Sequence, residues 1–235
     1  MIQKTKIKIG ELDCILVKNN ACKDPTAAII FCHGFGAPGT DLVSLADVII
    51  EMGKAQQNAV YVFPSAPIEL DPLFDSRAWW MIDIEKIQNL MKKGETREMQ
   101  RESPEQLPQR RVELTFVIDH CRNEFSLPAS KVVVGGFSQG SMLATDVALH
   151  YPESLGALIV WSGALINSVQ WTLQADRQSP LKIAQSHGIV DPILPIDGAR
   201  DLKAMLESHH HQVEYLEFKG PHSIPMNAIK LAGRL

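Results

Sequence analysis

Short apolar runs alternate with helix-like patterns along most of this 235-residue chain. The first two runs, residues 4–9 and 12–17, are close enough to pair as an antiparallel hairpin. The next run, residues 26–32, is almost wholly apolar, which is typical of a strand covered on both faces in a parallel sheet. Further strands are expected at residues 58–63, 131–134, 155–161, 181–184 and 212–218.

Between these runs, apolar residues recur at helical spacing. Helices are expected at residues 41–50, 104–125, 141–150, 198–208 and 224–235, with Asp41 capping the first of them. Strands that alternate with helices need crossover connections, which favour a parallel sheet. The pattern therefore predicts a single α/β domain over residues 1–235. We expect a mostly parallel twisted sheet with helices on both faces and an N-terminal antiparallel hairpin.

Residues 64–103 break this rhythm, because they contain no clear strand pattern. They hold Trp79 and Trp80, followed by a charged run at residues 92–98. A long excursion inside a compact domain is usually either a functional cover or a solvated loop. Because two tryptophans are rarely left in water, we expect a partial cover over an active site, with the charged run as a solvated helix face.

Composition limits the class of partner. The net charge of −4 offers no basic excess to displace counterions, which argues against a nucleic-acid partner. The four cysteines are scattered and form no CxxC pair, so buried free thiols are expected. The first residues lack the apolar run of a secretory signal, and no later run is long enough to span a bilayer. We therefore expect a cytoplasmic protein without stable membrane insertion.

The sequence from Gly136 to Gly140 matches the G-x-S-x-G pattern of a nucleophile elbow, with Ser138 at its centre. It follows an apolar strand and precedes a helical segment, which is the setting that such an elbow needs. The alternative is a glycine-rich turn with an incidental serine. In the catalytic interpretation, the backbone N–H of Gln139 is one half of an oxyanion hole.

A second glycine turn, residues 32–36, ends an earlier buried strand. A turn at this place allows a backbone N–H to face the serine, and we expect Phe35 to supply it. His33 is an alternative catalytic base. It precedes Ser138, however, whereas hydrolases of this kind run serine, acid, histidine along the chain, so a loop-shaping role is expected for His33.

The base should follow the serine and lie in a loop after a strand. The histidines after Ser138 are His150, His187, His209, His210, His211 and His222. His222 lies directly after the last strand, in a loop stiffened by glycine and proline, and is the predicted base. His150 ends a helix, and residues 209–211 are most simply a solvated cluster. Consecutive histidines do not share one helix face, so no metal site is expected there.

Asp191 is the predicted acid, because it follows the strand at residues 181–184 and stands before a proline that restricts the turn. Its carboxylate would accept the Nδ1–H of His222 and fix the tautomer of the imidazole. The remaining carboxylates have simpler explanations, with Asp197 and Asp201 at a helix start and Asp176 in a polar loop.

Six motifs together resemble the phospholipase/carboxylesterase family, which includes acyl-protein thioesterases and small bacterial carboxylesterases. They are His33–Gly36, Phe63–Pro67, Arg77–Trp80, Gly135–Gly140, His187-Gly188 with Asp191-Pro192, and His222. The resemblance implies an α/β-hydrolase fold, no cofactor, and hydrolysis of carboxylic ester or thioester bonds. It places Ser138, Asp191 and His222 on the catalytic triad, and Phe35 and Gln139 on the oxyanion donors.

The predicted activity is that of a serine hydrolase that cleaves a small-molecule ester or acyl substrate through an acyl-enzyme. Trp79, Trp80 and Met81 are candidates for an apolar acyl site, with core packing as the alternative. Ala37 stands where thioesterase members usually carry an aspartate, so the preference between ester and thioester substrates stays open. A serine peptidase and a non-catalytic ligand-binding protein on the same fold are the competing interpretations. The oligomeric state is also open, with a homodimer as one expectation.

Overall fold

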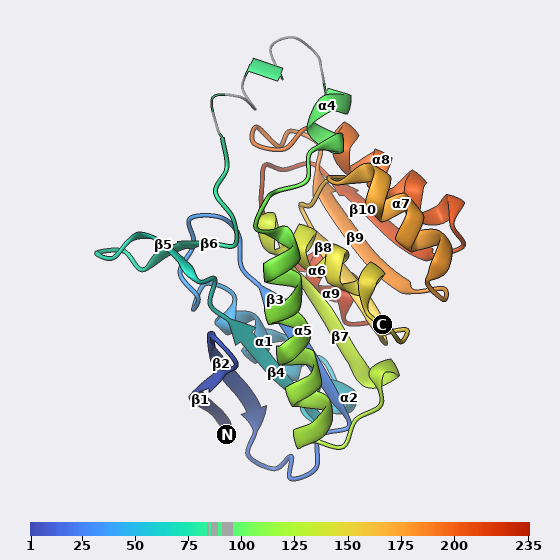
Figure 1. The fold of residues 1–235 in the computed structure, drawn as a ribbon. Coiled ribbons are helices and arrows are strands. Elements are labelled where there is room, and N and C mark those ends of the chain that lie inside the picture. Colours follow the sequence, from blue (N-terminus) through green and yellow to red (C-terminus); the bar gives the residue numbers. More distant parts are fainter. Residues whose placement is uncertain (84, 86–88, 91–95) are drawn as a thin grey trace.

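A computed structural model describes residues 1–83, 85, 89–90 and 96–235 of the protein. Within them, one eight-stranded sheet has the order β1-β2-β4-β3-β7-β8-β9-β10 (Figure 1). The strands are β1 (Ile2–Ile9), β2 (Leu12–Asn19), β3 (Ala27–Cys32), β4 (Ala59–Pro64), β7 (Val132–Phe137), β8 (Ala157–Trp161), β9 (Lys182–Gly188) and β10 (Gln212–Phe218). β1, β2 and β4 pair antiparallel, and the strands from β4 to β10 pair parallel. The predicted hairpin and mostly parallel sheet are confirmed.

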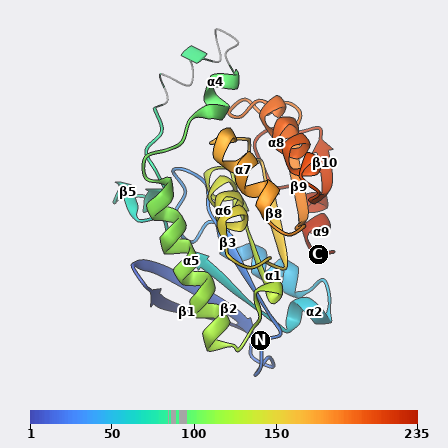
Figure 2. The ribbon, with the colours of Figure 1, turned by 45° about the vertical axis from the view of Figure 1, so that its right-hand side comes forward.

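Helices cover both faces of the sheet (Figures 1 and 2). The described helices are α1 (Val43–Ile50), α2 (Lys54–Gln57), α4 (Thr96–Arg101), α5 (Leu107–Glu124), α6 (Gln139–His150), α7 (Ser168–Arg177), α8 (Ile196–Ser208) and α9 (Met226–Ala232). One hydrophobic core joins the sheet to α5, α6, α7 and α8, and a second joins its other face to α1 and α9. None of the helices in the described part of the chain combines the length and the apolar character needed to span a bilayer.

The segment at residues 64–103 differs from its prediction. Its first part forms a small antiparallel hairpin of β5 (Ile68–Asp71) and β6 (Ser76–Ala78), which projects from one side of the molecule (Figure 1). The prediction that this stretch has no strand was therefore wrong. These strands are short and only partly buried, so they leave no apolar run in the sequence. Most of the charged run at residues 92–98 lies outside the described residues.

One further prediction on local structure was wrong, and a ten-residue helix was missed. Asp41 does not cap the first helix, because the N-cap position belongs to Leu42 and no side chain caps it. Helix α7 was not predicted, since it buries only Trp171 and Ala175 and its remaining sequence is mainly polar. The indole N–H of Trp171 donates to Oδ1 of the buried Asp146 at 2.8 Å, which fixes α7 against α6.

The histidine cluster at residues 209–211 is only partly solvated. His211 is buried, and its Nδ1 accepts the backbone N–H of Leu181 at 3.1 Å. Burial lowers the pKa of His211, and the nearby charges of His209 and His210 lower it further, although the backbone of Ala175 opposes this shift. The folded protein therefore holds His211 as a neutral acceptor.

This lowered pKa predicts a loss of stability in mild acid. As the pH falls below the ordinary histidine pKa of 6.5, the unfolded chain takes up a proton at His211 that the folded chain refuses, so the free energy of unfolding decreases. His211→Asn keeps an acceptor for Leu181 and removes the titration. Urea unfolding between pH 8 and pH 5 should show a shallower decline in the variant, by at most about 1.4 kcal/mol per pH unit. Equal slopes would contradict the prediction.

Candidate active site

Ser138 lies on a tight turn between β7 and α6. Its backbone has φ 53° and ψ −122°, a left-handed conformation that a non-glycine residue rarely adopts. The turn is held on both sides: the N–H of Ser138 donates to the carbonyl of Trp161 at 2.9 Å, and its own carbonyl accepts the hydroxyl of Ser141 at 2.7 Å. The strained serine is therefore fixed at the start of a helix, where free N–H groups point outward.

The two glycines of the elbow are required by close packing. A Cβ atom at Gly136 would lie 2.4 Å from the carbonyl oxygen of Cys32, and one at Gly140 would lie 2.1 Å from the same oxygen. Both distances are far below van der Waals contact, so neither position tolerates a side chain. The end of β3 is thus pressed directly against the elbow.

Asp191 and His222, the predicted acid and base, are hydrogen-bonded. His222 Nδ1 lies 2.6 Å from Asp191 Oδ2, and the carboxylate is fully buried. Asp191 Oδ1 accepts the backbone N–H groups of Ile193 at 2.8 Å and Leu194 at 2.9 Å. Burial raises the pKa of Asp191, but the hydrogen bonds from His222, Leu194 and Ile193 together outweigh it and hold the pKa below its ordinary range. An ionised acid thus faces Nδ1–H of the imidazole.

The loop that carries His222 is packed at the carboxyl ends of the neighbouring strands. The ring of Phe137, the residue before the serine, lies 4.6 Å from the ring of His222 between centroids. Ser162 donates its hydroxyl to the carbonyl of Ser223 at 3.3 Å, which ties the loop to the end of β8. The ends of β7, β9 and β10 therefore supply the predicted serine, acid and base at one edge of the sheet.

The predicted oxyanion segment lies beside the elbow. A Cβ atom at Gly34 would be 3.4 Å from the Cβ of Ser138, so this turn passes directly over the serine. In the described part of the chain, the N–H groups of Phe35 and Gln139 donate to no other protein group. Both are therefore free to bind an oxygen atom.

His33 shapes this turn. Its Nε2 accepts the backbone N–H of Ala66 at 3.0 Å, and its Nδ1 lies 2.9 Å from the carbonyl oxygen of Gly34. Burial lowers the pKa of His33, so the ring is neutral with its proton on Nδ1. Both nitrogens are engaged with backbone groups, which agrees with the loop-shaping role and not with that of a base.

Comparison with known proteins settles the family. A sequence model of the phospholipase/carboxylesterase family matches residues 13–232. The chain belongs to this family. Acyl-protein thioesterase 1 of Eremothecium gossypii is 26% identical over 197 residues, covering 78% of this chain and 74% of that protein. Acyl-protein thioesterase 1 homolog 1 of Dictyostelium discoideum is 26% identical over 207 residues, covering 85% of each chain.

A solved structure shows the same fold. The crystal structure of esterase PE8 superposes with a TM-score of 0.73 at 18% identity, covering 93% of this chain and 94% of its own. The α/β-hydrolase fold expected for a member of the phospholipase/carboxylesterase family is confirmed, and the protein is a hydrolase of esters or thioesters.

The phospholipase/carboxylesterase site contains one histidine that belongs to a family motif but for which the sequence predicted no role. His187 is fully buried, with its Nε2 2.8 Å from the carbonyl oxygen of Leu194 and 3.3 Å from Asp191 Oδ2. With the proton on Nε2, His187 donates to the carbonyl of Leu194, and its ring lies beside the carboxylate without a hydrogen bond to it. Its position near the end of β9, directly before a glycine and four residues before the predicted acid, is the signal that could have indicated this role.

The predicted acyl-site residues have different surroundings. Trp79 is fully buried and Trp80 is 4% exposed, whereas Met81 is 56% exposed. Both tryptophans belong to the core on the α5 and α6 face of the sheet. Their burial favours the packing alternative, and of the three residues Met81 retains surface that a substrate can reach.

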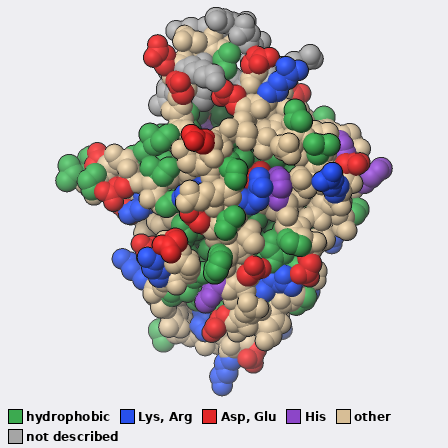
Figure 3. All heavy atoms as spheres, in the orientation of Figure 1, with side chains coloured by type: hydrophobic (Ala, Val, Ile, Leu, Met, Phe, Trp, Pro, Cys, Tyr) green, Lys and Arg blue, Asp and Glu red, His purple; other side chains and the backbone are tan. Residues whose placement is uncertain are grey.

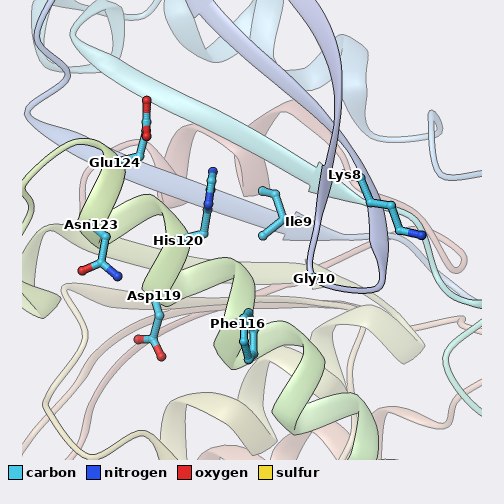
Figure 4. A pocket seen from close by; sticks show the side chains of 8 residues that line it. All are labelled: Lys8, Ile9, Gly10, Phe116, Asp119, His120, Asn123 and Glu124. Atoms are coloured by element: carbon cyan, nitrogen blue, oxygen red, sulfur yellow. The ribbon is translucent and has the colours of Figure 1, made fainter.

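A polar hollow occupies a separate part of this hydrolase. It has a volume of about 620 Å³, lies between the turn at Gly10 and the C-terminal half of α5, and shares no residue with the site (Figure 4).

On the face shown in Figure 3, the acidic and basic side chains of the described residues are interspersed and form no extended basic patch.

Proposed function

We propose that this protein hydrolyses carboxylic esters and acyl thioesters by a two-step acyl transfer, with Ser138 as nucleophile, His222 as base and Asp191 as the orienting acid. The observation that carries the proposal is the 2.6 Å hydrogen bond between His222 Nδ1 and Asp191 Oδ2, beside the strained turn of Ser138. This bond places the proton of His222 on Nδ1 and leaves Nε2 with a lone pair.

In the first step, Ser138 Oγ attacks the carbonyl carbon of the substrate while His222 Nε2 takes the hydroxyl proton. The carbonyl oxygen becomes an oxyanion, which the N–H groups of Phe35 and Gln139 bind. Each such donor contributes about 3 kcal/mol to the transition state in a comparable serine hydrolase. His222 then gives its proton to the leaving alcohol or thiol, and an acyl-serine remains.

In the second step, water attacks the acyl-serine and His222 removes its proton. The same two N–H groups stabilise the second oxyanion, and Ser138 leaves with the proton that His222 returns. Asp191, ionised in the folded protein, stabilises the imidazolium that forms in each half of the cycle.

The acyl group is proposed to be apolar. Ile189, Val190 and Ile193 flank Asp191 and are exposed, so apolar surface borders the acid–base pair. The names of the thioesterase relatives support a thioester, and that of esterase PE8 supports an ester.

A substrate series tests the proposal. We expect turnover of p-nitrophenyl esters from acetyl to palmitoyl and of matching acyl thioesters, measured as kcat/KM, with no cleavage of a peptide anilide. A steep fall beyond short chains would contradict the apolar acyl site. Anilide cleavage as fast as ester cleavage would indicate a peptidase, and absence of any turnover would indicate a ligand-binding protein.

A further inference from the structure

A buried hydrogen-bond bridge begins at the side chain of Gln139, the residue after the serine. This side chain is 2% exposed, although glutamine is usually found at the surface. Its Oε1 accepts the backbone N–H of Trp79 at 2.9 Å, and its Nε2 donates to the carbonyl of Trp80 at 2.8 Å. The amide thus pairs with both polar groups of a segment sixty residues away in sequence.

Trp79 continues the bridge to the other oxyanion segment. Its indole Nε1–H donates to the carbonyl of His33 at 2.9 Å, and the indole is fully buried. The rings of Trp79 and His33 lie 5.5 Å apart between centroids, so the indole also packs against the imidazole. One path therefore runs from the Gln139 amide through Trp79 to the turn that carries Phe35.

One end of this path lies at a residue with a free donor, and the other lies close to the second free donor. Gln139 provides one of them through its own N–H, and His33 stands two residues before Phe35, which provides the other. An oxyanion hole works only when both N–H groups are already aimed at one point, within about 0.5 Å of the productive geometry. A rigid link between the donor segments meets this requirement, because buried hydrogen bonds have no solvent to exchange with.

We propose that Trp79 and the side chain of Gln139 are positioning residues that hold the N–H groups of Phe35 and Gln139 at the separation an oxyanion needs. The inference rests on the proposed function and deepens it. Neither side chain contacts the substrate. The indole of Trp79 acts on the acyl transfer indirectly, as a buried residue that positions the donors, and does not line the acyl site.

Two substitutions remove the bridge without removing a catalytic donor. Gln139→Met keeps the length of the side chain and the backbone N–H but loses both hydrogen bonds. Trp79→Phe keeps an aromatic ring and loses the indole N–H. We expect each to lower kcat/KM per active site by about 10- to 100-fold with little change in KM, the range for a donor displaced by a fraction of an ångström to 1 Å. Because both substitutions break the same path, kcat/KM of the double variant should be little lower than that of the less active single variant.

A transition-state analogue separates positioning from general packing. With a trifluoromethyl ketone, Ser138 Oγ adds to the ketone carbon, its proton passes to His222, and the ketone oxygen becomes an oxyanion. We expect the inhibition constant of this compound to rise by the same factor as kcat/KM falls, while the affinity for the corresponding methyl ketone is unchanged. Active sites are counted with a fluorophosphonate, so that misfolded protein does not enter the rates.

Trp171→Phe is the matched control, because Trp171 is also a fully buried tryptophan whose indole N–H donates to a protein acceptor, at 2.8 Å. It should lower the melting temperature and leave kcat/KM per site unchanged. If Trp79→Phe and Gln139→Met behave like this control, the positioning role is overturned. If the wild-type protein neither reacts with the fluorophosphonate nor turns over any ester, the proposed function fails, and the inference fails with it.

Discussion

Replacing Ser138 with alanine is expected to lower kcat for a p-nitrophenyl ester by roughly 10⁵- to 10⁶-fold, as loss of the nucleophile does in another serine hydrolase. Alanine keeps the backbone and the Cβ atom and removes only the oxygen that forms the acyl-enzyme. Without that oxygen the hydrogen-bonded pair of Asp191 and His222 has no proton to take. Steady-state hydrolysis measures the rate, and a fluorophosphonate should label the wild-type protein once per chain and the variant not at all.

The backbone strain of Ser138 provides a second variant with a distinct result. At φ 53° a residue with a Cβ atom is strained by about 1–3 kcal/mol, whereas glycine is not. Ser138→Gly should therefore be as inactive as Ser138→Ala but more stable by about 1 kcal/mol, after the greater freedom of glycine in the unfolded chain is allowed for. Urea unfolding measures the difference.

Ser130→Ala, at an exposed serine just before β7, is the control for both variants and should retain full activity. Persistent labelling of Ser138→Ala would assign the nucleophile to another residue. Equal stability of the glycine and alanine variants would mean that the turn relaxes without the strained angle.

The sheet could be predicted because its strands are covered on both faces. Residues 59–64 are all buried, so the whole strand must be apolar and is visible as a continuous run. Helix α7 buries only Trp171 and Ala175, and a helix with so few buried positions leaves too little periodicity to detect. The β5–β6 hairpin could not be predicted for the same reason, since few of its residues are buried.

The site residues also differ in how far the sequence could predict them. Ser138, Asp191 and His222 stand in short turns directly after strands, and glycines mark each turn, so position in the chain identified them. The contacts of Gln139 with Trp79 join residues sixty apart, and those of Trp79 with His33 join residues 46 apart. Such pairs depend on how the loops pack over the sheet edge. No local pattern in the sequence encodes them.

Asp191→Asn is expected to lower kcat by about 10⁴-fold at neutral pH, and the hydrogen bonds around the carboxylate explain the size of the effect. Two backbone N–H groups, from Ile193 and Leu194, point at Oδ1. The amide oxygen of asparagine must take that place, because an NH₂ group there would face two donors. The NH₂ group is therefore directed at His222 Nδ1, which becomes an acceptor. The imidazole proton moves to Nε2, and the lone pair that should receive the proton of Ser138 is lost.

Asp197→Asn is the control, because Asp197 stands in the first turn of the next helix and its side chain is 71% exposed. It should leave kcat unchanged. In the wild-type protein, the Nδ1 proton of His222 should give a far-downfield proton NMR signal, since it is held at 2.6 Å by a buried carboxylate. That signal should vanish in Asp191→Asn and persist in Asp197→Asn. If Asp191→Asn loses the signal but keeps its kcat, the tautomer set by Asp191 has no influence on the rate. The base for Ser138 would then be another residue.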